Sequence, residues 1–146
     1  MNLSPHFTLE EFCASQTAAR HGIDNTLPSE LYEAAKRACL GLEEIRVLLR
    51  SNPIRISSGY RCPALNGLLG SRSTSQHLKA EAVDFTCSTY GSVDRIVRAI
   101  IDSPIKYDQL IREFDKDGGG WVHVSFSDKP KLQALIIDQD GTRAFA

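Results

Sequence analysis

The order of the apolar patterns along the chain restricts its fold more than any other feature of the sequence. Apolar residues at helical spacing dominate before residue 53, and short strand-like runs dominate after residue 108. Chains in which helices come first and strands come later typically form α+β domains. We therefore expect N-terminal helices packed on a small, mostly antiparallel sheet.

Three segments carry helix signals. Thr8 and Glu11 have the spacing of a capping box, so a helix should begin directly after Thr8. A longer helix is expected to start at residues 28–29 and to end at the Asn-Pro pair of residues 52–53. A further amphipathic helix is expected over residues 92–101. The apolar stripe of the longest helix consists of Leu31, Ala34, Ala35, Ala38, Leu42, Ile45 and Leu49.

Strand-like runs lie mainly in the second half of the chain. They cover residues 54–57, 82–86, 109–113, 121–126 and 132–137. Asp140 and Gly141 form a type I′ turn signal, which should fold residues 143–145 back as the last strand of a hairpin. Residues 59–80 are irregular apart from a short helix expected at 64–69, and a loop this long in a compact domain is usually functional.

Length and charge limit what the chain can bind. Its 146 residues are expected to form one domain that spans residues 1–146. The 17 lysines and arginines nearly balance the 18 aspartates and glutamates, which leaves a formal charge of −1. Such a balance offers no general attraction to nucleic acid or to an anionic membrane surface. We expect neither of these as a partner, and we expect a monomer.

The four cysteines form no recognisable metal or redox motif. Cys13, Cys39, Cys62 and Cys87 include no CxxC pair, which argues against a zinc ribbon or a thioredoxin-type site. A domain of this length needs no disulfide to hold its core, so we expect free thiols. The first residues lack the features of a secretory signal, so we expect synthesis in the cytoplasm without a signal peptide.

Two of the strand-like runs present polar residues on the face opposite their apolar residues. In residues 121–126, Val122 and Val124 alternate with His123, so the histidine should point away from the core. In residues 82–86, Asp84 takes the corresponding position. With His77 from the preceding loop, these residues could form a three-ligand zinc site with an open fourth position. On spacing alone, surface histidines or satisfied core histidines remain the alternative.

Three segments resemble three ordered blocks of one enzyme family. The segments are residues 57–66 (SSGYRCPALN), 75–84 (SQHLKAEAVD) and 121–125 (WVHVS). They are similar to the zinc-dependent D-Ala-D-Ala carboxypeptidase and L-alanyl-D-glutamate endopeptidase family, which includes VanY-like enzymes and many phage endolysins. Residues 108–113 (DQLIRE) resemble a further block that is common in its phage and prophage members. The similarity extends from Phe7 to Ser127.

The resemblance implies a zinc site on a Hedgehog/D-Ala-D-Ala peptidase-like fold. The ligand positions of the family fall on His77, Asp84 and His123, so these residues are expected to bind Zn²⁺. His6 and His21 lie outside the three blocks and are not expected to be ligands. Zinc lowers the pKa of a coordinated water to about 7 and polarises a peptide carbonyl. A nearby carboxylate must still accept the proton of the water and pass it to the leaving amine.

Glu113 is the preferred candidate for that general base. It ends the DQLIRE run, and the loop after it leads into the strand of His123, so the two residues are expected to be neighbours on adjacent strands. Several family members place the acid/base three residues before the last zinc histidine, but that position is Gly120 in this chain. Asp115 and Asp117 are alternatives, although a solvated acidic turn also explains their position.

Four further residues are candidates for contact with the substrate. Arg61 resembles the substrate-binding arginine of the family, since a guanidinium can bind a carboxylate through two hydrogen bonds, but it could also anchor the loop. Ser75 is expected to contact the zinc-site groups or the substrate, and Gln76 is expected to do the same unless it only caps the loop. Trp121 is expected to line the cleft or to pack in the core. Ala80 replaces a common glycine of the family, and a positive φ there would cost on the order of 1 kcal/mol.

The resemblance therefore implies a zinc metallopeptidase that hydrolyses peptidoglycan stem peptides, at L-Ala–D-Glu or at D-Ala–D-Ala, with zinc-activated water. The alternative is a non-catalytic structural or wall-binding module, with zinc bound, in a phage or prophage particle. The lack of a secretion signal fits a protein that acts on the cell wall after phage-type release or as a component of the virion. The sequence leaves the scissile bond open.

Overall fold

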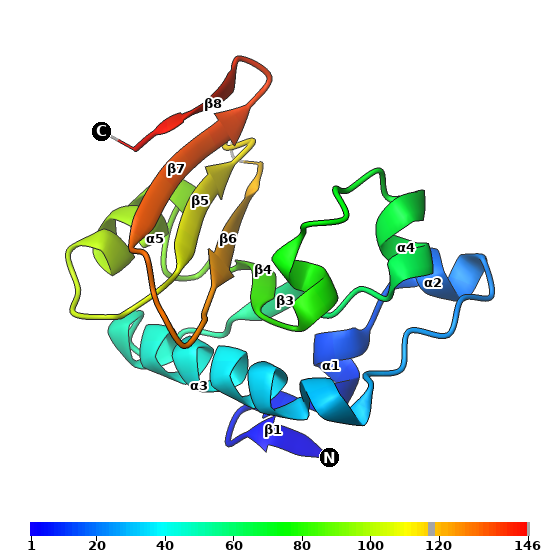
Figure 1. The fold of residues 1–146 in the computed structure, drawn as a ribbon. Helices are drawn as coiled ribbons and strands as arrows, with labels where there is room; N and C mark the ends of the chain where they lie inside the picture. Colours follow the sequence, from blue (N-terminus) through cyan, green and yellow to red (C-terminus); the bar gives the residue numbers. More distant parts are fainter. Residues whose placement is uncertain (117–118, 146) are drawn as a thin grey trace.

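The computed structural model describes residues 1–116 and 119–145 and has the expected α+β architecture (Figure 1). The helices are α1 (Leu9–Cys13), α2 (Gln16–Arg20), α3 (Tyr32–Leu48), α4 (Pro63–Leu68) and α5 (Val93–Ile101), with the 3-10 helices η1 (Ser29–Leu31) and η2 (Gln76–Lys79). The strands are β1 (Asn2–Ser4), β2 (Phe7–Thr8), β3 (Arg55–Ser58), β4 (Ala82–Thr86), β5 (Gln109–Glu113), β6 (Trp121–Ser125), β7 (Gln133–Asp138) and β8 (Gly141–Ala144).

Six of the strands form one mixed sheet in the order β3-β4-β6-β5-β7-β8. Four of its five pairings are antiparallel, as predicted, and β5 pairs with β7 in parallel. The parallel pair requires the chain to cross from β6 past β5 before it enters β7. Backbone hydrogen bonds from Leu132 to Tyr107 and from Gln133 to Asp108 hold this crossing loop against the start of β5.

The two faces of the sheet have different roles. The apolar face of β4 and β6 carries Val83, Phe85, Val122 and Val124, all fully buried. These side chains share one hydrophobic cluster with residues of α3 and α5, the helices that cover this face (Figure 1). Because side chains alternate along a strand, Asp84 and His123 must lie on the opposite face. The apolar face therefore fixes which side of the sheet can carry a polar site.

Most of the elements begin within one residue of the position that the sequence predicts. At α1, the Thr8 side chain accepts from the Glu11 amide and the Glu11 carboxylate accepts from the Thr8 amide, which confirms the capping box. The helix expected over residues 92–101 is α5, and the Ser92 side chain caps it by accepting from the Arg95 amide. The longest helix differs at its start, because residues 29–31 form a 3-10 turn before α3 begins. The predicted strands shift by one or two residues at some of their ends.

An N-terminal β1–β2 hairpin is present that the sequence did not predict, because two- and three-residue strands show no periodicity. Glu43 of α3 anchors it. Its carboxylate accepts hydrogen bonds from the Ser4 hydroxyl at 2.6 Å and from the His6 amide at 2.7 Å, and the His6 ring lies 2.7 Å away. The His6 ring therefore contacts Glu43, and His6 is not part of the group formed by His77, Asp84 and His123. α2, which begins at the Ser15 cap, was also not predicted.

Within residues 1–116 and 119–145, no helix combines the length and the apolar character that crossing a lipid bilayer requires. All four cysteines are free thiols. Burial raises the pKa of the Cys39 thiol to about 12, so this cysteine is an inert core residue.

Candidate metal centre

Three side chains from separate segments converge on the polar face of the sheet. Asp84 in β4 and His123 in β6 are direct cross-strand partners, and His77 lies in η2 immediately before β4. One ligand atom from each residue lies within 4.8 Å of the other two. Among the described residues, this is the one group of three or more His, Cys, Asp or Glu side chains that could hold a metal ion. These are the three residues that the sequence predicts as zinc ligands.

The His77 ring is oriented by a hydrogen bond on the side away from Asp84. Its Nδ1 donates to the carbonyl oxygen of Gly59 over 2.7 Å. A carbonyl can only accept, so Nδ1 carries a proton, and Nε2 is the ring nitrogen left for another partner. That Nε2 atom lies 3.3 Å from Asp84 Oδ1. Metal-binding histidines commonly use their second ring nitrogen in this way.

Gly59 is required at this position because the chain passes close to α1. A Cβ atom built on Gly59 would lie 2.2 Å from the backbone oxygen of Phe12. The same oxygen accepts the amide hydrogen of Tyr60. The glycine of the SSGYR segment therefore lets the chain approach α1, and this approach places the carbonyl that orients His77.

The two oxygens of Asp84 face different partners. Oδ1 lies 2.9 Å from His123 Nδ1 and 3.3 Å from His77 Nε2, while Oδ2 contacts the Arg61 guanidinium at 3.3 Å. Burial acts to raise the pKa of Asp84, but hydrogen bonds from His123 and His77 and their positive charge outweigh it and hold the pKa well below its usual range. Asp84 is therefore an ionised carboxylate in a buried position.

The donor set fits a zinc ion. Two imidazole nitrogens and one carboxylate oxygen are among the ligands that catalytic zinc uses, with a fourth position left for water or substrate. Zinc–ligand bonds of about 2.0–2.1 Å at tetrahedral angles place neighbouring donor atoms about 3.3 Å apart. The separations of 2.9 Å and 3.3 Å around Asp84 Oδ1 are close to that value. The buried, ionised Asp84 would also supply negative charge to a cation.

Arg61 lies beside this group with its guanidinium already engaged. Nε donates to the Ser58 hydroxyl and Nη1 donates to the Ser71 hydroxyl, both at 3.0 Å, while Nη2 contacts Asp84. The side chain is 13% exposed. The sequence predicts a substrate-binding role for Arg61, which stays a prediction. The contacts add a second role, because they fix the far oxygen of Asp84.

Glu113 reaches the same cavity from the end of β5. Its direct cross-strand partner is Trp121, and Ile111 is the residue opposite His123, so Glu113 and His123 are diagonal neighbours. Glu113 Oε1 lies 3.9 Å from His123 Nδ1. Burial and the charge of Asp84 raise the pKa of the Glu113 carboxyl. A raised pKa suits a carboxylate that accepts and returns a proton near neutral pH.

The other acidic candidates are placed differently. Gly120 has a φ of +85°, and a Cβ there would lie 2.4 Å from the backbone oxygen of Glu113, so the tight end of the β5–β6 hairpin excludes a side chain. Asp115 is not among the described residues that line the cavity of about 240 Å³ between Glu113 and the three predicted ligands. Asp117 lies outside the described residues.

The remaining predicted site residues also lie at or beside the cavity. Ser75 lines it and caps η2, where its hydroxyl accepts from the His77 amide at 3.2 Å. Trp121 lines it as well, as the direct cross-strand partner of Glu113. The Gln76 side-chain nitrogen donates to Asp108 at 2.9 Å and to Glu81 at 3.3 Å, so two protein carboxylates engage this atom. Their predicted contacts with substrate stay predictions.

Two further residues shape the loops beside the site. Ala80 has a φ of 58°, so the chain does adopt the left-handed conformation that a glycine would favour at this position. Ser71, which holds Arg61, is a site residue that the sequence did not single out. It lies in an irregular loop, where no periodicity or motif indicates the direction of a side chain.

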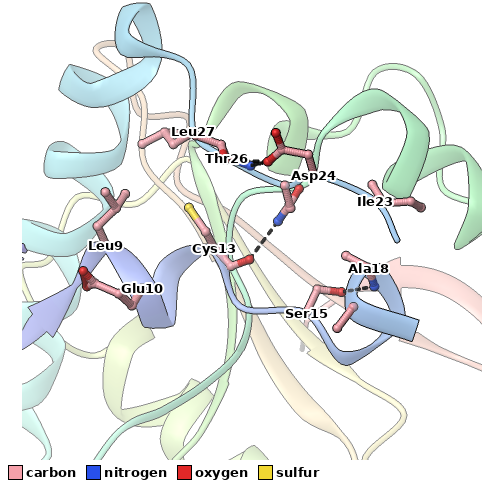
Figure 2. A pocket seen from close by; sticks show the side chains of 11 residues that line it. Leu9, Glu10, Cys13, Ser15, Ala18, Ile23, Asp24, Thr26 and Leu27 are labelled. Atoms are coloured by element: carbon pink, nitrogen blue, oxygen red, sulfur yellow. Dashed lines mark hydrogen bonds between the residues drawn. The ribbon is translucent and has the colours of Figure 1, made fainter. Parts of the chain in front are cut away.

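A separate pocket of about 380 Å³ lies where α1 and α2 meet the following loop (Figure 2). Its polar groups bond to one another, as when Thr26 donates to Asp24 and Ser15 accepts from Ala18. Burial raises the pKa of the Cys13 thiol, which disfavours a thiolate nucleophile. None of the described residues that line this pocket is a histidine. We therefore take the group on the polar face of the sheet, and not this pocket, as the candidate functional site.

Comparison with known proteins gives one finding. A family model described as Peptidase M15 matches residues 5–125, which includes all three predicted ligands and Glu113. A search of curated proteins found no match.

Proposed function

The chain belongs to the peptidase M15 family and is a zinc metallopeptidase, and on this basis we propose that it hydrolyses peptide bonds in peptidoglycan stem peptides with its zinc on His77, Asp84 and His123. The observation that carries the proposal is the convergence of these three donors beside Glu113 in one cavity. The cavity opens on the polar face of the sheet, where a peptide can reach it.

Each residue around the zinc site would have a separate role in hydrolysis of the peptide. Bound zinc supplies a Lewis acid that polarises a carbonyl and makes water more acidic. Glu113 accepts the proton of the attacking water and returns it to the leaving amine, for which its raised pKa is suited. Trp121, the cross-strand partner of Glu113, lines the cavity and is placed to contact a bound peptide. Arg61 and Gly59 hold Asp84 and His77 in position.

The test combines zinc analysis with digestion of purified peptidoglycan. We expect about one zinc per chain by elemental analysis and new amino termini after digestion. Mass analysis of the fragments then identifies the bond, since cleavage at D-Ala–D-Ala releases free alanine and cleavage at L-Ala–D-Glu exposes the amine of D-glutamate.

Glu113→Gln is the matched variant for this test. It keeps the size of the side chain but removes the proton acceptor, so we expect a loss of roughly 100-fold or more in kcat with zinc still bound. Asp115→Gln is the control, and it should digest peptidoglycan at the original rate. Bound zinc without digestion by the intact chain would instead support the non-catalytic alternative.

A further inference from the structure

The metal centre lies beside a larger cleft of about 620 Å³ that the proposed chemistry leaves unused. Ser71, Ser75 and His123 line both spaces, so the two lie side by side. We call the larger space the basic cleft. Its walls carry Arg72, Lys79 and Lys131, and its floor carries Gln109, Ile111 and Leu135.

The floor of the basic cleft continues the row of metal ligands across the sheet. Asp84 pairs with His123, His123 pairs with Ile111, and Ile111 pairs with Leu135. Residues in register on neighbouring strands share one face of the sheet. A peptide held at the metal centre can therefore extend over β5 and β7 and rest aliphatic groups on Ile111 and Leu135.

The walls give the basic cleft a net positive charge. Arg72, Lys79 and Lys131 are exposed, and none of them forms a salt bridge with a carboxylate of the described residues. Asp108 is the one acidic residue among the described lining, and it is 4% exposed. A cleft lined by charges of one sign attracts ligands of the opposite sign.

Asp108 holds the two walls in place. One carboxylate oxygen accepts from Gln76 in η2 at 2.9 Å, and the other accepts from the backbone amide of Lys131 at 3.1 Å. These bonds tie the wall that carries Lys79 to the crossing loop that carries Lys131. The positions of the two lysine backbones are thus fixed before a ligand binds, which lowers the entropic cost of binding.

We propose that the basic cleft binds the part of the peptide substrate that carries free carboxylates, with Lys79 and Lys131 as the residues that distinguish a carboxylate from an amide. The inference rests on the proposed function for its choice of a peptide ligand. It adds a specificity site on the β5–β7 side of the metal centre. The three cations are long, exposed side chains, so their contribution should depend on salt.

Binding of two synthetic peptides to the zinc-loaded full chain tests the proposal. The first is L-alanyl-γ-D-glutamyl-L-lysyl-D-alanyl-D-alanine, and the second is the same peptide with both free carboxylates converted to amides. Calorimetric titration is done on a chain that carries Glu113→Gln, so that the peptide is not consumed. We expect tighter binding of the acidic peptide and a steeper loss of its affinity as salt rises.

The variant pair Lys79→Gln and Lys131→Gln should weaken binding of the acidic peptide roughly tenfold, since each exposed ion pair contributes about two- to fivefold. Binding of the amidated peptide should not change. The control pair, Lys36→Gln and Lys106→Gln, removes the same charge outside the cleft, from a partly exposed and an exposed lysine, and should change neither affinity.

The possible outcomes separate this inference from the proposed function. Equal binding of both peptides, no binding of either, or equal losses in the two variant pairs would overturn the basic cleft as a carboxylate site. Equally tight binding of a short oligothymidylate would overturn its selectivity for peptides. Selective binding of the acidic peptide by a chain that digests no peptidoglycan would uphold the cleft and count against the catalytic proposal.

Discussion

Arg61 is the residue at which two roles can be separated most clearly. Its three donor nitrogens are engaged by Ser58, Ser71 and Asp84, which are protein groups and not substrate. A residue that fixes a metal ligand acts on the affinity for the metal. A residue that binds the carboxylate of the substrate acts on KM and does not change the affinity for the metal. The two roles therefore predict different measurements.

Replacement of Arg61 by Met should weaken zinc binding by roughly 10- to 100-fold, as is typical when an outer partner of a metal ligand is lost. The physical reason is that Asp84 Oδ2 loses its cation and the carboxylate becomes free to rotate. The zinc Kd is measured by competition with a chromophoric chelator. Arg55→Met, at an exposed position of β3, is the control and should keep the original Kd. An unchanged zinc Kd with a raised KM would leave Arg61 as a substrate residue alone.

Ala80 and Gly120 show how single positions in the sequence relate to the backbone. Ala80 stands where the family pattern commonly has glycine, and its φ of 58° is the left-handed conformation that glycine favours. The sequence also shows that Gly120 cannot serve as the general base. Only the structure explains why no larger residue would fit, since a Cβ there would collide with the backbone of β5.

At the scale of elements, periodicity predicted the helices and strands that bury a continuous apolar stripe. Thus β4 and β5 have the predicted bounds, and α5 follows its Ser92 cap. The β1–β2 hairpin was missed because its anchor, Glu43, lies 37 residues after His6 in the chain. A stabilising contact between such distant residues leaves no local pattern.

Glu43→Gln should destabilise the fold by about 1–3 kcal/mol at pH 7, the usual cost of losing hydrogen bonds to a charged group. Burial acts to raise the pKa of Glu43, but hydrogen bonds from Ser4 and His6 outweigh it, so the folded-state pKa lies below the ordinary value of 4.5. The contribution of Glu43 is therefore present above that ordinary value and is lost as the pH falls through the folded-state pKa.

Urea unfolding of the original chain and of the Glu43→Gln variant measures this effect at several pH values. The difference in unfolding free energy should be largest near pH 7 and should shrink below pH 4.5. Glu44→Gln, at the exposed neighbouring position of α3, is the control and should behave like the original chain. A difference that does not change with pH would show that the Glu43 charge is not what anchors the hairpin.

For the whole molecule, the metal centre would add one more link between segments that already contact one another. His77, Asp84 and His123 come from η2, β4 and β6. A ligand that binds the folded state alone stabilises it in proportion to the logarithm of its concentration. Zinc should therefore act as a cross-link between these elements.

Removal of zinc should lower the melting temperature. At free zinc one hundred times the Kd, binding contributes about 2.7 kcal/mol, which corresponds to roughly 5–10 °C for a domain of this size. Differential scanning calorimetry with and without a chelator measures the shift. His123→Ala should lose the response to zinc. A melting temperature that changes with neither zinc nor chelator would contradict the proposed zinc site.

By itself, the sequence determined the α+β class, most of the element bounds, the residues on the polar face and the resemblance that implied zinc. These properties follow from local spacing, which a linear pattern records. The tertiary structure decided what depends on register and on loop geometry: the diagonal placement of Glu113, the hold of Arg61 on Asp84, and the basic cleft between η2 and the crossing loop. Those relations join residues that are far apart in the chain, and only packing of the core against the sheet brings them within contact distance.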